Sequence, residues 1–333
     1  MSSKPSTKKT PPTLTVSSPG LPPQPQVNIT HGNSRISASL PTGESIEILL
    51  FGATIISWKD AHGNEKLWLS EAAKLDGTKA VRGGVPLVFP VFGTDAGHTE
   101  TSKLPQHGFA RTSRWEFLGK STSESSALSS TDPGDSSIKL DFGLSPSNLS
   151  KESRDAWPYE FGLIYSVTLG RDGLATSIVV RNEEDAEGDT GKSFEFQVLM
   201  HTYLRVKDIA DISVGGIESS PYIDKVASTT TTSDTSALSI TSKTDRVYTP
   251  AAGPTAPVVV NEGGKKSYSV VRDNLNEVVV WNPWQDGAED IGDFTPKSGY
   301  KNMICVEAGA VKGYQKLDVG ETFEGGQIIT SSL

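Results

Sequence analysis

Residues 45–50 read Ser-Ile-Glu-Ile-Leu-Leu, and here polar and apolar side chains alternate, with Ile46, Ile48 and Leu50 on one face. A period of two residues is typical of a β-strand with one buried face. Residues 51–58 (FGATIISW) continue as a second β-type segment. This stretch therefore predicts a β fold near the start of the chain.

Short segments of the same type recur along the rest of the chain, separated by Gly, Asn, Asp and Pro. They are residues 115–118, 138–142, 163–169, 175–180, 194–199, 278–281, 303–307 and 327–330. We find no convincing helical periodicity over ten or more residues, and no alternation of β and α units. Many short strands with frequent turn signals predict an all-β sandwich or barrel of antiparallel sheets.

Composition restricts the class of function. The 333 residues carry a net charge of −9 from 31 basic and 40 acidic residues. This acidic balance argues against nucleic acid as a partner, because binding to a phosphate backbone needs a basic face. No apolar run approaches the roughly 20 residues of a membrane span. The one cysteine, Cys305, excludes an intramolecular disulfide framework and indicates a reducing compartment, so we expect a cytoplasmic protein.

Low-complexity segments set the expected domain bounds. Residues 1–26 are rich in Pro, Ser and Thr and predict a disordered tail, followed by a single domain over 27–333. Residues 120–137 predict a surface loop between strands. Residues 227–243 are rich in Thr and Ser and predict a loop with a short strand near 238–240, with an edge strand as the alternative.

Two residues at the ends of apolar segments could carry acid–base chemistry. Glu307 follows the apolar residues 303–306, where a lone carboxylate would be costly to desolvate. His201 follows the apolar residues 196–200, and a hydrogen-bonded structural histidine is an equal alternative there. His107 precedes Gly108 and could donate a hydrogen bond to a sugar oxygen or stabilise a turn.

Arg82 and Arg111 stand next to small residues and could form an anion pocket, because guanidinium groups bind phosphate oxygens in pairs. Solvated surface charges are the alternative. The five histidines and the lone Cys305 show no metal-ligand spacing, and no glycine-rich nucleotide loop is present. A cofactor-free enzyme or a binding protein remains.

Together these motifs resemble the glucose-6-phosphate 1-epimerase (hexose-6-phosphate mutarotase) family of the aldose 1-epimerase superfamily. The resemblance covers residues 27 to the C-terminus. It is carried by FGATIISW (51–58), LWLSEAAKLDGTKAVRGGVPLVFPVFG (67–93), KLPQHGFARTSRWEFLG (103–119), HTYLRV (201–206), YIDK (222–225), VVVWNPW (278–284), PKSGYKNMICVEAG (296–309) and LDVGETF (317–323). It implies a β-supersandwich of two large, twisted, mostly antiparallel sheets, as in galactose mutarotase.

The resemblance also implies the site residues. His201 would be the catalytic acid and Glu307 the catalytic base. Substrate binding is implied for five further residues, with the arginines on the phosphate and the aspartate on sugar hydroxyls: Arg82, Gln106, His107, Arg111 and Asp224. The family usually has Pro at the position of Ala308, a departure that leaves the carboxylate in place.

The expected activity is interconversion of the α and β anomers of a hexose 6-phosphate without a cofactor or a metal. The expected partner is this small molecule, with neither nucleic acid nor membrane involved, and the expected state is a monomer. Two alternatives stay open. One is an aldose 1-epimerase acting on unphosphorylated sugar, and the other is a non-catalytic protein that binds sugar phosphates.

Overall fold

The structure, a computed structural model, describes residues 24–123, 137–183 and 192–332. Antiparallel strands dominate these residues, and helices are few and short. The helical elements are α1 (Lys151–Ala156), α2 (Trp284–Asp290) and the 3₁₀ turns η1 (Ala110–Thr112), η2 (Pro146–Asn148), η3 (Ile209–Asp211) and η4 (Lys297–Asn302). Within the described residues, no helix is both long enough and apolar enough to cross a bilayer.

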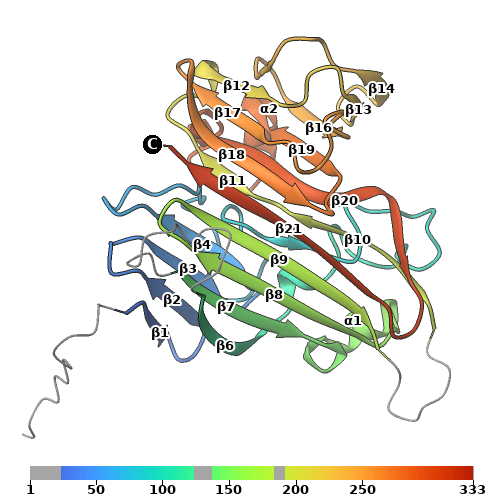
Figure 1. The fold of residues 1–333 in the computed structure, drawn as a ribbon. Helices are drawn as coiled ribbons and strands as arrows, with labels where there is room; N and C mark the ends of the chain where they lie inside the picture. The colour runs from blue at the N-terminus through green and yellow to red at the C-terminus, as the bar shows by residue number, and fades with distance from the viewer. Residues whose placement is uncertain (1–23, 124–136, 184–191, 333) are drawn as a thin grey trace, which may run out of the picture.

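A nine-stranded antiparallel sheet forms one layer of the molecule and faces the viewer in Figure 1. Its strands, in spatial order, are β15 (Leu238–Ser239), β12 (Ile212–Gly215), β17 (Val258–Glu262), β18 (Lys265–Asp273), β21 (Thr322–Ser331), β9 (Gly173–Asn182), β8 (Phe161–Leu169), β7 (Ser137–Leu144) and β6 (Glu116–Ser123).

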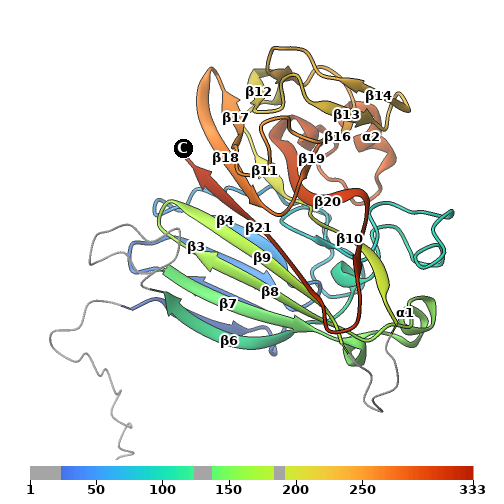
Figure 2. The same cartoon turned by 45° about the vertical axis from the view of Figure 1, so that its right-hand side comes forward.

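An eight-stranded sheet and a four-stranded sheet form the other layer, as the two views in Figure 1 and Figure 2 show. The eight-stranded sheet contains β14 (Thr229–Thr232), β13 (Pro221–Asp224), β16 (Thr244–Tyr248), β19 (Glu277–Asn282), β20 (Met303–Leu317), β10 (Phe194–Met200) and β5 (Leu87–Val88), with β11 (Tyr203–Arg205) also paired to β20. The four-stranded sheet contains β1 (Gln26–Thr30), β2 (Arg35–Ser39), β3 (Ser45–Leu49) and β4 (Thr54–Lys59). An isolated bridge between Ile55 and Val85 joins the two sheets.

The main core lies between these layers. Ile36 and Ile48 of the four-stranded sheet belong to the same buried cluster as Phe142 of β7 and Val180 of β9, and all four side chains are fully inaccessible. Each such side chain contributes about 1.5–3 kcal/mol when it leaves water. The alternating apolar residues of each strand thus hold the layers together, and the expected all-β sandwich is confirmed.

Most predicted strands are present, with different ends. Residues 45–49 form β3, and Ile46 and Ile48 are buried, as is Leu50 directly after the strand. The apolar strand expected to end at Glu307 instead continues to Leu317. The segment 227–243 contains the expected short strand as β15, and its Thr229–Thr232 forms the edge strand β14 as well.

Two predictions fall largely outside the described residues. The tail expected over 1–26 lies outside up to residue 23, and Gln26 already begins β1. Within the expected loop 120–137, β6 extends to Ser123 and β7 begins at Ser137, while residues 124–136 are not described.

Candidate active site

A cavity of about 210 Å³ lies on the face of the eight-stranded sheet that points away from the nine-stranded sheet. Strand alternation puts it there, because Val278, Val280 and Val306 enter the main core while Val279 and Glu307 point the other way. Its lining residues are Arg82, Phe92, Gln106, His107, Arg111, His201, Lys225, Asp245, Val279, Trp281, Ile291 and Glu307. Six of the seven residues predicted from the sequence are therefore brought together.

The segment from residue 81 to 93 contacts both β4, through the bridge between Val85 and Ile55, and β10, through β5. Its Arg82 lines the cavity. The N–H of Gly84 donates to Trp68 O at 2.8 Å, and the N–H of Tyr203 donates to Gly84 O at 2.9 Å. Gly84 has a φ of +68°, and a Cβ at this position would lie 2.1 Å from Ile55 O. Only glycine fits so close a backbone approach.

His201 and Glu307 form a buried pair at the floor of the cavity. His201 follows β10 and Glu307 lies within β20, and the distance from His201 Nδ1 to Glu307 Oε1 is 3.3 Å. The imidazole stacks on the Tyr203 ring with the centroids 4.7 Å apart and meets the Trp281 ring edge-on. Stacked and edge contacts of this type fix the ring plane, so the pair is held in one orientation.

Burial opposes charge on both members of the pair. Desolvation raises the pKa of the Glu307 carboxyl well above its ordinary value, and Asp245 adds to this effect. Desolvation lowers the pKa of the His201 imidazole well below its ordinary value, and His107, Arg111 and Arg82 lower it further. The two shifts together favour a pair that carries one proton in total, and a carboxyl and an imidazole beside a ligand are groups that can act as acid and base.

Arg82 and Arg111 give the cavity an anion-binding side. Arg82 Nε donates to Asp293 Oδ1 at 3.0 Å and one terminal nitrogen donates to the Tyr203 hydroxyl at 3.3 Å. Arg111 donates from one terminal nitrogen to Gln106 O at 2.9 Å, and its buried Nε has no hydrogen-bond partner among the described residues. Both guanidinium groups keep N–H donors for a ligand oxygen.

His107 is fixed as a neutral hydrogen-bond donor. The backbone N–H of Gly93 donates to His107 Nδ1 at 3.0 Å, so the ring proton resides on Nε2. Desolvation, together with Arg111 and Lys225, lowers the pKa of His107 to about 2. One ring nitrogen thus accepts a backbone hydrogen bond, as expected for a histidine that stabilises a turn, while donation from the other nitrogen to a sugar oxygen stays a prediction.

Asp224 is not brought to the cavity. Residues directly opposite each other on paired strands share a face of the sheet. Asp224 is paired with Arg246, so its side chain lies on the face opposite to that of Asp245. Its carboxylate accepts from Arg246 Nε at 2.9 Å and from the backbone N–H groups of Val226 and Ala227. Asp224 therefore closes the turn after β13.

Sequence reasoning missed Asp245 and Lys225, which both line the cavity. Lys225 Nζ lies 3.9 Å from Asp245 Oδ2 and 4.4 Å from the centroid of the Phe92 ring. Lys225 follows Asp224 directly, and alternation turns it to the cavity side. The motif YIDK thus ends at a residue that lines the cavity, Lys225, whereas its Asp224 does not line it.

The two aspartates allow a direct test. We expect Asp245→Asn to lower kcat/KM for the expected anomer exchange of a hexose 6-phosphate by about 10- to 100-fold. This is the effect of weakening one charged hydrogen bond to the sugar. Asp224→Asn keeps an acceptor for the turn and should change kcat/KM less than threefold. Steady-state kinetics of both purified variants measure this, and a larger loss in Asp224→Asn would contradict the assignment of faces.

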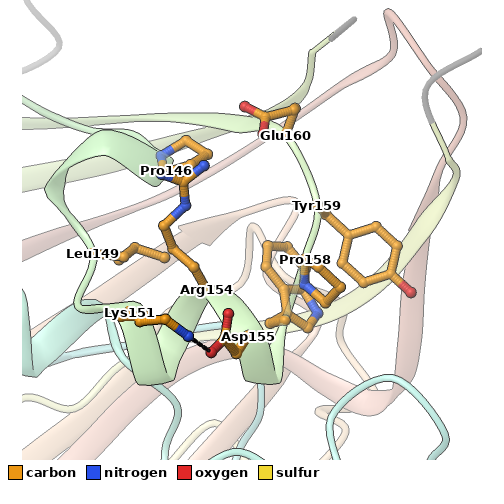
Figure 3. Close-up of a pocket in the computed structure, with 9 residues that line it drawn as sticks. Pro146, Leu149, Lys151, Arg154, Asp155, Pro158, Tyr159 and Glu160 are labelled. Carbon is orange, nitrogen blue, oxygen red and sulfur yellow. Dashed lines mark hydrogen bonds and ion pairs between the residues drawn. The ribbon is translucent and has the colours of Figure 1, made fainter. Parts of the chain in front are cut away.

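A larger cavity of about 510 Å³ lies beside α1, and Figure 3 shows its lining. Its charged side chains include Lys151 and Asp155, which pair with each other at 2.5 Å, and Arg154, which extends toward Pro146. It contains no histidine and no buried carboxylate. This cavity lacks an acid–base pair, so its size does not make it the active site.

The chain matches the family model described as aldose 1-epimerase over residues 34–330. It is 34% identical over 283 residues to a protein of Cenchrus ciliaris, covering 84% of this chain and 79% of the relative. It is 32% identical over 270 residues to a protein of Escherichia coli K12, with 80% of each covered. Both relatives carry the name "Putative glucose-6-phosphate 1-epimerase".

Solved structures show the same architecture. The crystal structure of a "putative mutarotase" from Salmonella typhimurium superimposes with a TM-score of 0.72 at 26% identity, covering 89% of this chain and 90% of that one. A galactose 1-epimerase from Lactobacillus acidophilus superimposes with a TM-score of 0.62 at 14% identity, covering 92% and 97%, and this likeness supports the fold alone.

Proposed function

Because the chain belongs to the aldose 1-epimerase family, we propose that it interconverts the α and β anomers of a hexose 6-phosphate, with glucose 6-phosphate as the first candidate. One observation carries this proposal. The buried His201–Glu307 pair, 3.3 Å apart, shares a cavity with two guanidinium groups that have free donors. The first feature fits proton transfer at the hemiacetal and the second fits a phosphate.

The reaction needs only two proton transfers. The step starts from the form of the pair that has its one proton on His201. Glu307 takes the proton from O1 of the sugar as His201 gives its proton to the ring oxygen O5, and the C1–O5 bond breaks to leave an open aldehyde. Rotation about C1–C2 exposes the other face of the carbonyl. Closure returns both protons and gives the other anomer. Each positioned acid or base contributes about 10²- to 10⁴-fold in rate.

The remaining cavity residues orient the sugar phosphate. Arg82 and Arg111 bind the phosphate, far from the reacting C1, and this binding energy positions the ring. Asp245, which lines the cavity, takes the role that the family resemblance implied for Asp224, as acceptor for sugar hydroxyls. His107 donates from Nε2, and Gln106 lies exposed at the solvent side of the cavity.

Magnetisation-transfer NMR on glucose 6-phosphate tests the proposal. The rate of anomer exchange of glucose 6-phosphate should rise in proportion to protein concentration. The protein should accelerate this exchange more than it accelerates the exchange of unphosphorylated glucose. Exchange at the uncatalysed rate with retained binding would establish the non-catalytic alternative. Equal acceleration for glucose and glucose 6-phosphate would establish the aldose 1-epimerase alternative. Galactose 6-phosphate and mannose 6-phosphate in the same assay rank the substrates.

The pH dependence of kcat/KM should respond to Lys225. The ammonium of Lys225 favours the charged carboxylate and so lowers the pKa of Glu307, against the larger rise caused by burial. In Lys225→Met the carboxyl keeps its proton to higher pH. Since activity needs one proton on the pair, we expect the alkaline limb of the profile to move to higher pH. A shift to lower pH would contradict this sign.

A further inference from the structure

Cys305 lies beside the acid–base pair, although the sequence shows it as an isolated residue. Cys305 and Glu307 are two apart on β20 and share one face of the sheet. Tyr203 of β11 is directly opposite Cys305, and His201 lies two residues before Tyr203. The strand register therefore puts a thiol next to the imidazole and the carboxylate.

The three side chains present their donor atoms to a common point. A nitrogen of His201, the sulfur of Cys305 and an oxygen of Glu307 all lie within 4.8 Å of one another. Glu307 Oε2 is a buried atom without a hydrogen-bond partner among the described residues, and His201 Nδ1 approaches Glu307 Oε1 to 3.3 Å but makes no hydrogen bond. Donor atoms around a tetrahedral zinc ion lie about 3.5 Å apart. Side-chain movements of about 1 Å would therefore bring the three donor atoms to zinc-binding distances.

From this arrangement we propose that His201, Cys305 and Glu307 form a binding site for Zn²⁺ that blocks the active site. A thiolate and an imidazole select a soft or borderline cation over Mg²⁺ or Ca²⁺. Three protein ligands leave a fourth position, which faces the cavity because His201 and Glu307 line it. Cys305 is fully buried, so an ion would reach it through the cavity that His201 and Glu307 line.

Occupation of this site is incompatible with the proposed reaction. As Zn²⁺ binds, an S–Zn bond replaces the S–H bond of Cys305, and both the thiol proton and the one proton carried by the His201–Glu307 pair leave to solvent. The ion also takes the lone pairs of His201 and Glu307, so neither can exchange a proton with the sugar. The inhibition rests on the proposed function, whereas the binding of the ion does not.

The sole cysteine of the chain makes the test specific. We would titrate chelator-treated protein with Co²⁺ and record thiolate-to-cobalt charge-transfer absorption, which only Cys305 can produce. Zn²⁺ binding by calorimetry and anomer exchange with increasing Zn²⁺ complete the measurement. Cys305→Ala and Cys305→Val both remove the thiol but differ in side-chain volume. An effect shared by both variants therefore comes from loss of the thiol and not from altered packing at this buried position.

We expect the charge-transfer band and Zn²⁺ inhibition in the natural protein, reversed by a chelator. The variants should keep their basal exchange rate, lose the band and need at least tenfold more Zn²⁺ for inhibition. Absence of the band at saturating Co²⁺, or unchanged zinc sensitivity in both variants, would overturn the site. A band in a protein without anomer exchange would support the site and refute the proposed function.

Discussion

Glu307→Gln is expected to lower kcat for anomer exchange by about 10³-fold, within the range for loss of a positioned base. Glutamine has the shape of the carboxyl group but cannot accept the O1 proton. The side chain is almost completely buried, at 1% exposure, so solvent cannot supply a substitute base at the same place. Magnetisation-transfer NMR at saturating glucose 6-phosphate measures the loss.

His201→Asn should produce a similar loss, and the double variant should lose little more than either single variant. Both residues belong to one proton-transfer unit, joined by the 3.3 Å contact, and residues that act as a unit are not additive. If the fold-loss in kcat of the double variant equalled the product of the two single fold-losses, the residues would act independently.

Stability and binding provide the controls for these variants. Burial works against the ionised carboxylate of Glu307, so a neutral amide should leave the free energy of unfolding unchanged or higher. Affinity for glucose 6-phosphate should stay within a few-fold, because Arg82 and Arg111 are intact. A variant that fails to melt cooperatively, or that no longer binds, would leave the catalytic role of Glu307 without support.

Local patterns predicted the strands because alternation needs no knowledge of distant neighbours. The stretch 45–50 forms β3 up to residue 49, and the apolar segments at 163–169 and 175–180 form most of β8 and β9. Strand ends were less predictable. Glu307 looked like a terminus because a carboxylate follows apolar residues there, yet β20 continues past it since β10 and β19 pair on either side.

The face of a side chain was the harder problem. Choosing between Asp224 and Asp245 requires the register of β13 against β16, which pairs Asp224 with Arg246 and leaves Asp245 on the other face. The motif YIDK contains no information about that register. The proximity of Cys305 to His201 likewise depends on pairing between residues about one hundred positions apart. The family resemblance supplied six of the residues that line the cavity, but neither Asp245 and Lys225 nor the proximity of Cys305.

Arg111→Met is expected to raise KM for glucose 6-phosphate by about 100-fold while kinetics on free glucose stay nearly unchanged. Arg111 is chosen over Arg82, because Arg82 also binds Asp293 and the Tyr203 hydroxyl beside His201. Burial and the nearby Arg82 lower the pKa of Arg111 to about 10, so it remains charged at neutral pH. A paired, charge-assisted bond to phosphate is worth about 3 kcal/mol.

Two further variants separate charge from geometry. Arg111→Lys keeps the positive charge but not the planar fork, so its KM should fall between those of the natural protein and Arg111→Met. Arg154→Met removes an arginine from α1, beside the cavity of Figure 3, and should change nothing. If Arg111→Met weakened glucose and glucose 6-phosphate equally, the guanidinium would serve the sugar ring, and the preference for a phosphorylated substrate would need another source.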